Sequence, residues 1–261
     1  MGVLNVTPDS FSDGGRFIDF DAAVARGEAM LASGATLIDV GGESTRPGAD
    51  PVPVEDELRR VVPVIRALVA RGAMVSIDTS KAEVIHAALA AGAHMVNDVY
   101  ALRQPGALEA AAASEAAICV MHMQGEPRSM QRSPTYIDVV AEVTAFLAAR
   151  VAACEAAGVA RDRLVIDPGF GFGKTLAHNL ELLRGLHALT GGDLPVLAGL
   201  SRKSMLEKIT GRAVDQRLAG SLALAYAALQ GGARIIRCHD VAETCDVVKV
   251  WLALRQSGVG V

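Results

Sequence analysis

Carboxylate and amide side chains stand where several short apolar runs of the chain end. Asp39, Asp78 and Asp167 each lie at the end of such a run, and Asn5 and Asn97 close two others. Carboxylates that converge on one site can bind paired N–H groups, hold a metal ion or stabilise a developing cation. Asn5 could offer its amide oxygen to a metal ion, or it could simply cap the loop that follows it. This pattern predicts a polar site built from the ends of several elements.

Basic side chains follow two later apolar runs. Ser201, Arg202 and Lys203 come after one run, and Arg237 and His239 close the last. The solvated start of a helix would account for the serine but not for two adjacent cations. Residues two apart on a strand share a face, so Arg237 and His239 could clamp an oxyanion together.

A loop at 41–48 combines glycines with hydroxyl groups and a guanidinium. Thr45 donates one hydrogen bond and Arg46 donates as a planar fork, and both suit an anion. A flexible surface loop is the alternative interpretation of the same composition.

A second glycine-rich loop at 167–175 comes close to the phosphate-binding pattern GxxxxGK[ST]. Pro168 stands where that pattern requires its first glycine, so a phosphate cradle is not expected here. We expect Asp167 to be a strand-end carboxylate and the loop to turn Phe170 or Phe172 towards a ligand.

The elements that would position these residues repeat along the chain. Glycines follow the expected helices and precede short apolar runs, as expected for a helix end in the left-handed conformation followed by a buried parallel strand. Strands are expected at 2–5, 36–40, 74–78, 95–97, 117–121, 164–167, 196–200 and 234–237. Helices are expected at 21–33, 54–70, 81–91, 105–114, 136–157, 176–189, 215–230 and 242–254. Strict alternation of eight strands and helices favours an α/β fold of the (β/α)8 TIM-barrel class over an open doubly wound sheet.

Composition limits the class of protein. The chain has 261 residues, of which 51% are hydrophobic and 21% are charged, and its formal net charge is −4. No linker divides it, so we expect a single domain covering 1–261. The charge disfavours nucleic acid as a partner, and the apolar runs are too short to span a membrane. The four scattered cysteines indicate reduced thiols and no zinc site, so a soluble cytoplasmic protein is expected.

Several of these segments closely resemble the dihydropteroate synthase family, a folate-pathway family that sulfonamides inhibit. The longest are GVLNVTPDSFSDGG at 2–15 and GGESTRPG at 41–48. The resemblance continues in order with SIDT at 76–79, VND at 96–98, MHMQG at 121–125, DPGFGF at 167–172, GLSRKS at 199–204 and RCHDV at 237–241. It covers essentially the whole chain, and several motifs are individually specific.

The resemblance implies an activity and a set of site residues. The family joins 6-hydroxymethyl-7,8-dihydropterin diphosphate to 4-aminobenzoate, releasing pyrophosphate, with Mg²⁺ assisting. The pterin is expected on Asp78, Asn97, Met121, Asp167 and Lys203, and the diphosphate on Asn5, Thr45, Arg237 and His239, with Asn5 near Mg²⁺. The 4-aminobenzoate is expected on Arg46, Pro47, Phe172, Ser201 and Arg202, and catalytic roles fall on Asp78, Lys203, Arg237 and His239.

Chemistry agrees with these expectations. An arylamine is a poor nucleophile, so departure of pyrophosphate to leave a pterin cation, followed by attack, is an attractive order of events. Asp78 would stabilise that cation. Two alternatives stay open at this stage: a methyltransferase that presents methyltetrahydrofolate, and a catalytically silent pterin-binding homologue. The cations disfavour the first, and the complete set of loop motifs disfavours the second.

Two further expectations come from the resemblance. Family members usually carry a short segment before the first strand, whereas Met1 begins almost on the strand here, so a capping segment is expected to be short or absent. The family is usually dimeric through late helices, and the apolar stretch at 218–229 could supply a homodimer face or could be buried against the barrel.

Overall fold

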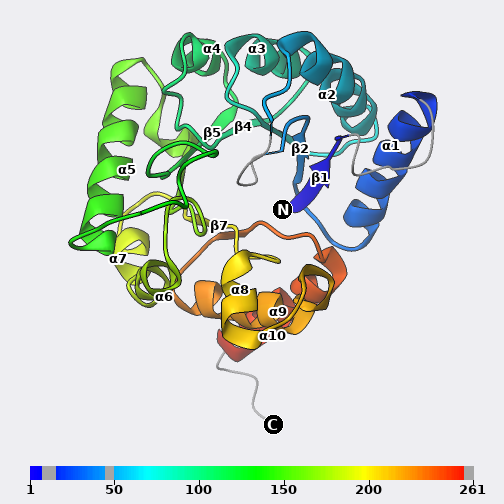
Figure 1. Cartoon of the computed structure of the whole chain (residues 1–261). Coiled ribbons are helices and arrows are strands. Elements are labelled where there is room, and N and C mark those ends of the chain that lie inside the picture. The colour runs from blue at the N-terminus through cyan, green and yellow to red at the C-terminus, as the bar shows by residue number, and fades with distance from the viewer. Residues whose placement is uncertain (8–15, 45–49, 256–261) are drawn as a thin grey trace.

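A ring of helices surrounds a set of short parallel strands in the computed structural model (Figure 1). The structure describes residues 1–7, 16–44 and 50–255. In these residues the strands are β1 (Gly2–Asn5), β2 (Ile38–Gly41), β3 (Val75–Asp78), β4 (Met95–Asp98), β5 (Ala117–Met121), β6 (Leu164–Asp167), β7 (Leu197–Ala198) and β8 (Ile235–Ile236). The helices are α1 (Arg16–Ala32), α2 (Val54–Val69), α3 (Ala82–Ala90), α4 (Ala107–Ala112), α5 (Val139–Ala156), α6 (Leu176–Arg184), α7 (His187–Thr190), α8 (Ser204–Thr210), α9 (Leu218–Gln230) and α10 (Val241–Arg255). Short 3-10 turns span Arg161–Arg163 and Val214–Gln216.

The strands follow one another around the ring in sequence order. β1 to β6 form one parallel sheet, and β7 and β8 form a separate parallel pair. Single bridges join the two groups, between Ile166 and Val196 on one side and between Gly2 and Cys238 on the other. The expected α/β barrel is therefore confirmed, although its last two strands are joined to their neighbours by isolated bridges rather than by full ladders.

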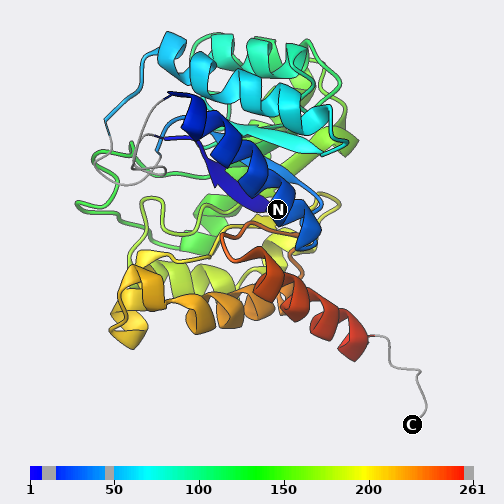
Figure 2. The same ribbon diagram turned by 90° about the vertical axis from the view of Figure 1, so that its right-hand side faces the viewer.

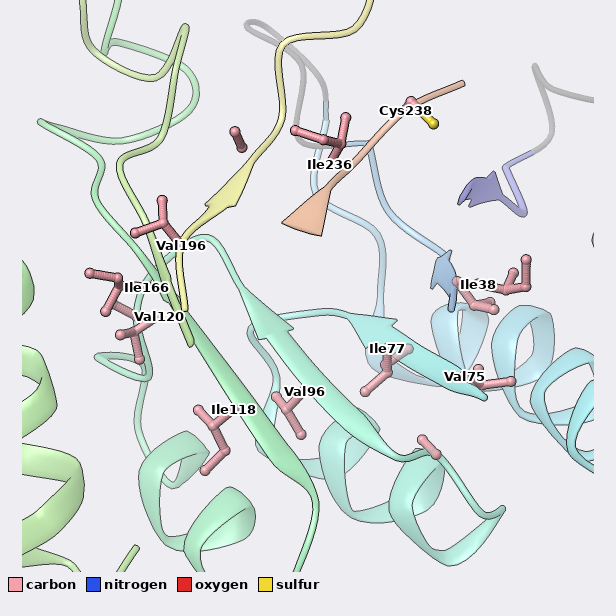
Figure 3. Close-up of a cluster of buried hydrophobic side chains, with 14 of the residues drawn as sticks. Ile38, Val75, Ile77, Val96, Ile118, Val120, Ile166, Val196, Ile236 and Cys238 are labelled. Atoms are coloured by element: carbon pink, nitrogen blue, oxygen red, sulfur yellow. The ribbon is translucent and has the colours of Figure 1, made fainter. Parts of the chain in front are cut away.

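Alternation along the strands separates an outer apolar layer from the barrel interior. Ile38, Val96, Ile118 and Ile166 are buried against the surrounding helices (Figure 3). The residues between them point inwards, where a small apolar cluster of Met95, Cys119, Val165 and Leu197 forms. Because the side-chain period of a strand is two, Asn97 and Asp167 share the inner face with Met95 and Val165. The apolar cluster thus lies below the polar strand ends.

Most element boundaries agree with the sequence-based expectations. The glycines expected after helices, at positions 34, 72, 92, 158 and 232, all have positive φ, between 81° and 99°. Strands β1, β5 and β6 have the expected ends. The other strands shift by one or two residues at an end.

The structure corrects three helix predictions. The helix expected at 176–189 is interrupted after Arg184, so α6 and α7 are separate. Val140 packs closely against Gly185 at this break, where a Cβ would lie 2.7 Å from Val140 Cγ2. The stretch expected at 215–230 opens with a 3-10 turn before α9, and α8 was not foreseen as a helix. α9 and α10 lie side by side (Figure 2). In the described part of the chain, no helix is both long enough and apolar enough to cross a membrane.

Candidate active site

A lateral row of residues crosses the ends of the first four strands. Asn5 of β1 pairs in register with Gly41 of β2, Gly41 with Asp78 of β3, and Asp78 with Asn97 of β4. Gly41 leaves space in this row, because a Cβ there would lie 3.7 Å from Asn5 Oδ1 and 3.5 Å from Asp78 Cβ. The register therefore brings an amide, a gap, a carboxylate and a second amide together at one end of the barrel.

Arg237, which follows β8, reaches across the barrel to two buried carboxylates. Its Nε donates to Asp39 Oδ2 at 2.6 Å, and its Nη2 donates to Asp78 Oδ2 at 2.7 Å. Asn97 Nδ2 donates to the same Asp39 oxygen at 3.0 Å. Asp39 Oδ1 and Asp78 Oδ1 are buried and have no hydrogen-bond partner among residues 1–7, 16–44 and 50–255. Each of these two carboxylates thus keeps one oxygen unpaired within the described part of the chain.

Burial perturbs the Asp78 carboxyl group. Desolvation raises its pKa from 3.8 to about 7, against the lowering effect of Arg237, and Asp39 adds to the rise. A carboxylate that is costly to ionise and that keeps one free oxygen favours a positive charge placed beside it. This is the electrostatic environment that a cationic intermediate would require.

Asp167 closes β6 at the same end of the barrel. Its Oδ1 accepts a hydrogen bond from the Gly169 backbone N–H at 2.7 Å. Burial raises the pKa of Asp167, while the Gly169 bond and the charges of Lys203, Arg237 and Lys174 lower it. The Lys203 ammonium lies 4.2 Å from the centre of the Phe172 ring. Burial lowers the pKa of Lys203 to about 8.

An apolar patch adjoins these charges. Met121 pairs in register with Asp167 and is buried with Val99 and Met123, and Phe172 packs against this group. A flat apolar ring system with hydrogen-bonding edges would find both kinds of surface here.

Ser201 and Arg202, in the loop between β7 and α8, make different contacts. Ser201 Oγ lies 3.1 Å from His239 Nδ1 and accepts from the His239 backbone N–H at 3.2 Å. Burial lowers the pKa of His239 to about 4, so its imidazole is neutral near pH 7. Arg202 is instead bonded to Asp240, with Nε 3.0 Å from Oδ2. The guanidinium of Arg202 is thus held by a neighbouring carboxylate.

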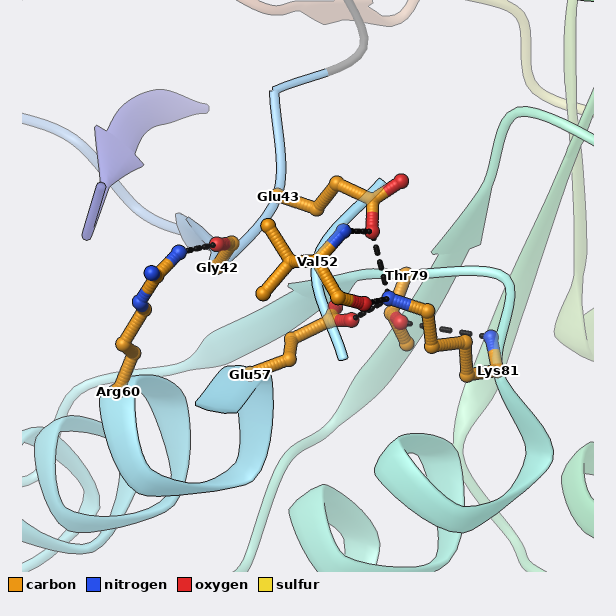
Figure 4. A network of polar contacts seen from close by, with 7 residues as sticks. All are labelled: Gly42, Glu43, Val52, Glu57, Arg60, Thr79 and Lys81. Atoms are coloured by element: carbon orange, nitrogen blue, oxygen red, sulfur yellow. Dashed lines mark hydrogen bonds and ion pairs between the residues drawn. The ribbon is translucent and has the colours of Figure 1, made fainter. Parts of the chain in front are cut away.

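The expected residues Thr45, Arg46 and Pro47 lie outside the described residues. The described residues on either side of them are held by Lys81 (Figure 4). Lys81 Nζ lies 2.5 Å from Glu43 Oε2 and from Glu57 Oε2, and it donates to the Val52 carbonyl at 2.7 Å. A cavity of about 220 Å³ adjoins this network and reaches Asp78.

Sequence reasoning named Asp39 as a strand-end carboxylate but gave it no role in binding. The structure makes it the fully buried partner of Arg237 and Asn97. Its place between two outward-facing apolar residues, Ile38 and Val40, was the signal that its side chain points into the barrel. Lys81 was not singled out, because Glu43, Val52 and Glu57 lie far from it in the sequence. Lys174 was not singled out either: two of its acceptors are backbone carbonyls of its own loop, and His122 is distant in the sequence.

Comparison with known proteins agrees with this geometry. A family model described as "Pterin binding enzyme" matches residues 1–239. The dihydropteroate synthase of Escherichia coli K12 is 52% identical over 251 residues, which cover 96% of this chain and 89% of that protein. The chain belongs to the dihydropteroate synthase family of pterin-binding enzymes.

Solved structures extend the similarity to the fold. A structure of Xanthomonas albilineans dihydropteroate synthase with 4-aminobenzoic acid has a TM-score of 0.93 and 54% identity, covering 98% of this chain and 92% of that one. Another from the same organism, in complex with 7,8-dihydropteroate, has a TM-score of 0.90 and 52% identity, covering 98% and 93%. The activity of this chain is accordingly that of a dihydropteroate synthase, a transferase of folate biosynthesis.

Proposed function

We propose that this chain condenses 6-hydroxymethyl-7,8-dihydropterin diphosphate with 4-aminobenzoate through a pterin cation, at the strand-end site described above. The observation that carries the proposal is the buried Asp78 carboxylate, which has one oxygen on Arg237 and one that is unpaired within the part of the chain that the structure describes. The same arginine that would attract the leaving diphosphate thus contacts the carboxylate that would face the cation.

The pterin is assigned to the inner face of the barrel. Asp167 would accept the paired N–H groups of the 2-amino and N3 edge, and Asp78, Asn97 and Lys203 would bind the other polar atoms. Met121 would pack near the ring, because it is buried with Val99 and Met123 at this end. The alternation of apolar and polar groups supports this orientation.

The diphosphate is assigned to Asn5, Thr45, Arg237 and His239. Arg237 supplies a permanent positive charge, whereas the low pKa of His239 makes its imidazole a neutral hydrogen-bonding group in the free protein. The 4-aminobenzoate is assigned to Phe172, Ser201, Arg46 and Pro47. Arg202 is assigned to the carboxylate of 4-aminobenzoate. Its guanidinium would then bind this carboxylate and Asp240 at the same time.

The proposed reaction has two bond changes. The C–O bond between the pterin methylene carbon and the diphosphate breaks, and its electron pair leaves with pyrophosphate. The arylamine nitrogen then donates its lone pair to the methylene carbon and loses a proton to solvent or product anion. Asp78 stabilises the positive charge between the two steps, and the substrate-contacting groups exclude water that would otherwise capture the cation.

The oxygen atoms of the site fit Mg²⁺ if Asn5 supplies one ligand and the substrate diphosphate and water supply the others. Mg²⁺ prefers oxygen ligands and usually keeps several waters and substrate phosphates. Among residues 1–7, 16–44 and 50–255 no group of three or more His, Cys, Asp or Glu could hold a metal, whereas Asn5 offers an amide oxygen beside the space left by Gly41. We therefore assign Asn5 as the protein ligand of an ion held mainly by the diphosphate, whose leaving-group charge it would neutralise.

Three assignments complete the proposal. The chain acts as a single domain in the cytoplasm. It forms a homodimer through its late helices, where Val250, Leu252 and Leu254 of α10 are exposed. Sedimentation of the purified protein tests the dimer, and a monomer at micromolar concentration would contradict it.

Isotope exchange tests the cationic route. The diphosphate substrate is prepared with ¹⁸O in the oxygen that bridges carbon and phosphorus, and it is incubated with the protein in the absence of 4-aminobenzoate. Reversible bond cleavage should move the label into non-bridging positions of the same phosphate group, and Asp78→Asn should slow that movement. Normal turnover with both substrates but no movement of label in the wild-type protein would favour direct displacement instead.

A further inference from the structure

Lys174 is a buried lysine that the proposed reaction does not use. Its side chain is only 3% exposed and lies in the loop between β6 and α6. The Gly-Lys-Thr sequence at 173–175 resembles part of a phosphate loop, but Pro168 rules out the complete pattern. A buried ammonium group in this position therefore needs another explanation.

Acceptors surround the Lys174 ammonium group. It donates to the backbone carbonyls of Gly169 at 2.9 Å and Phe172 at 3.0 Å, and it lies 2.8 Å from His122 Nδ1. The His122 carbonyl is a longer acceptor at 3.4 Å. Burial and the charge of Lys174 lower the pKa of His122 to about 3, so the imidazole is neutral and can accept at Nδ1. The ammonium thus joins the glycine-rich loop to the segment that follows β5.

The same loop is pressed directly onto the segment after β5. Gly169 has φ +66°, and a Cβ there would collide with the His122 carbonyl oxygen. Gly173 has φ +57°, and a Cβ there would collide with the Gln124 carbonyl oxygen. Only glycine permits this approach at both positions. Gln131 and Tyr136 reach the carbonyls of Gly171 and Gly173 from the segment after β5. Lys174 spans the contact from the loop itself and is the side chain that bonds to the Phe172 carbonyl.

Two groups of the proposed site depend on this loop. The Gly169 N–H orients the Asp167 carboxylate, and the Phe172 ring lies 4.2 Å from the Lys203 ammonium. Asp167 is also held by the ladder between β5 and β6, because it pairs in register with Met121. Phe172 lies beyond the strand, so its position depends more strongly on the loop.

We propose that Lys174 is a positioning residue that fixes the 169–173 loop and thereby places the Phe172 ring for 4-aminobenzoate. The proposal rests on the proposed contact between Phe172 and that substrate. A side chain that served only to stabilise the fold would affect both substrates to the same degree. Lys174 should affect mainly the aromatic amine, because it bonds to the Phe172 carbonyl itself.

Lys174→Met tests the proposal, since methionine keeps an unbranched apolar stem and removes the ammonium. Loss of the hydrogen bonds that the Lys174 amino group donates predicts a rise in KM for 4-aminobenzoate of about tenfold or more. The Kd of the dihydropterin diphosphate, measured by calorimetry, should change by less than about threefold. Hydrogen exchange should become faster at residues 169–174 and stay unchanged in β3 and β4.

Lys208→Met is the matched control, because it makes the same change at an exposed lysine of α8. This variant should keep the wild-type KM for both substrates. Tyr136→Phe removes a different bond to the same loop, from the Tyr136 hydroxyl to the Gly173 carbonyl at 2.8 Å, and should raise the KM for 4-aminobenzoate less than Lys174→Met does. If Lys174→Met fails to fold, His122→Phe removes one acceptor of the ammonium while keeping an aromatic ring beside Phe146, and a smaller rise in the same KM is expected.

Two results would overturn the proposal: an unchanged KM for 4-aminobenzoate together with unchanged exchange at 169–174, or equal losses for both substrates. Phe172→Ala separates this failure from failure of the proposed function. If Phe172→Ala leaves the KM for 4-aminobenzoate unchanged, the assigned role of Phe172 is wrong. Hydrogen exchange in Lys174→Met still decides whether Lys174 holds the loop.

Discussion

Replacement of Asp78 by asparagine should separate activity from stability. Burial raises the pKa of this carboxyl from 3.8 to about 7 in the free protein. That difference corresponds to roughly 4 kcal/mol of free energy between the protonated and ionised forms. If a pterin cation recovers most of this cost in the transition state, its loss should lower kcat about 100- to 1000-fold. Asparagine has nearly the same shape and can still present an oxygen to Arg237.

The pH dependence of the same variant gives the sign of the effect. The folded protein binds the Asp78 proton more tightly than the unfolded chain does. This group therefore stabilises the fold fully below pH 3.8, and its contribution is lost as the pH rises to about 7. At pH 8 Asp78→Asn should be more stable than the wild type, by up to roughly 4 kcal/mol, whereas at pH 4 the two should differ little. Urea unfolding at the two pH values measures this.

The steady-state assay supplies the refutation. The kcat/KM of the wild type should rise with pH to a plateau above about pH 7, because kcat/KM reports ionisation in the free enzyme. Asp78→Asn should lose that rise, and it should lower kcat far more than it weakens binding of the dihydropterin diphosphate. Equal losses in kcat and in substrate affinity would refute a role specific to the transition state. If kcat/KM of Asp78→Asn still rises with pH as in the wild type, the titrating group is not Asp78.

Three other changes test separate parts of the structure. Gly169→Ala should destabilise the fold by at least about 2 kcal/mol, because the new methyl group would collide with a backbone carbonyl and the residue has a positive φ. Gly211→Ala is the control, since this glycine has φ +68° and no atom near its Cβ position. It should lower the free energy of urea unfolding clearly less. Lys81→Met should lower the unfolding free energy by about 3 kcal/mol by leaving the buried Glu57 carboxylate without its cation; a loss below about 0.5 kcal/mol would contradict that account. His239→Gln should reduce the loss of stability between pH 7 and pH 5 by about 1–2 kcal/mol, because burial lowers the pKa of His239 to about 4 and the folded state resists its protonation. Denaturation curves of the wild type and the variant at pH 7 and pH 5 measure this change. If the unfolding free energy of both proteins falls by the same amount between the two pH values, another group is responsible for the loss.

Local pattern was sufficient to predict most of the framework. Glycines after helices and short apolar runs predicted the barrel because both arise from backbone geometry within a few residues. The break at Gly185 was missed: the close packing of Val140 of α5 against this glycine is a contact between distant residues that the local pattern does not contain. The helix α8 is only a few residues long, so its apolar pattern was too short to be recognised.

In the site, too, single residues could be predicted from the sequence, whereas contacts between residues distant in the sequence could not. The ends of the apolar runs identified the strand-end acids, period-two alternation paired Arg237 with His239, and the resemblance to a family supplied their roles. The pairing of Arg237 with Asp39 joins residues 198 positions apart, and the bonds between Lys174 and His122 span 52 positions. No local spacing encodes such pairs, because they depend on the order in which strands meet around the ring. The partners of the buried cations therefore had to come from the structure.

The difference between Asp39 and Asp78 explains why only one of the two acids is proposed to act on the cation. Asp39 Oδ2 receives N–H groups from both Asn97 and Arg237, whereas Asp78 receives one, from Arg237, within residues 1–7, 16–44 and 50–255. Asp39 is fully buried and holds the guanidinium from below the strand ends, so that the other arm of the fork reaches Asp78. Asp39 thus fixes the position of Arg237. The Asp78 carboxylate stays poorly solvated, so a positive charge placed beside it would stabilise its ionised form. A neutral residue at position 39 would free Arg237 to pair with Asp78 through both arms, which would lower the pKa of Asp78 and weaken the electrostatic drive towards the cation.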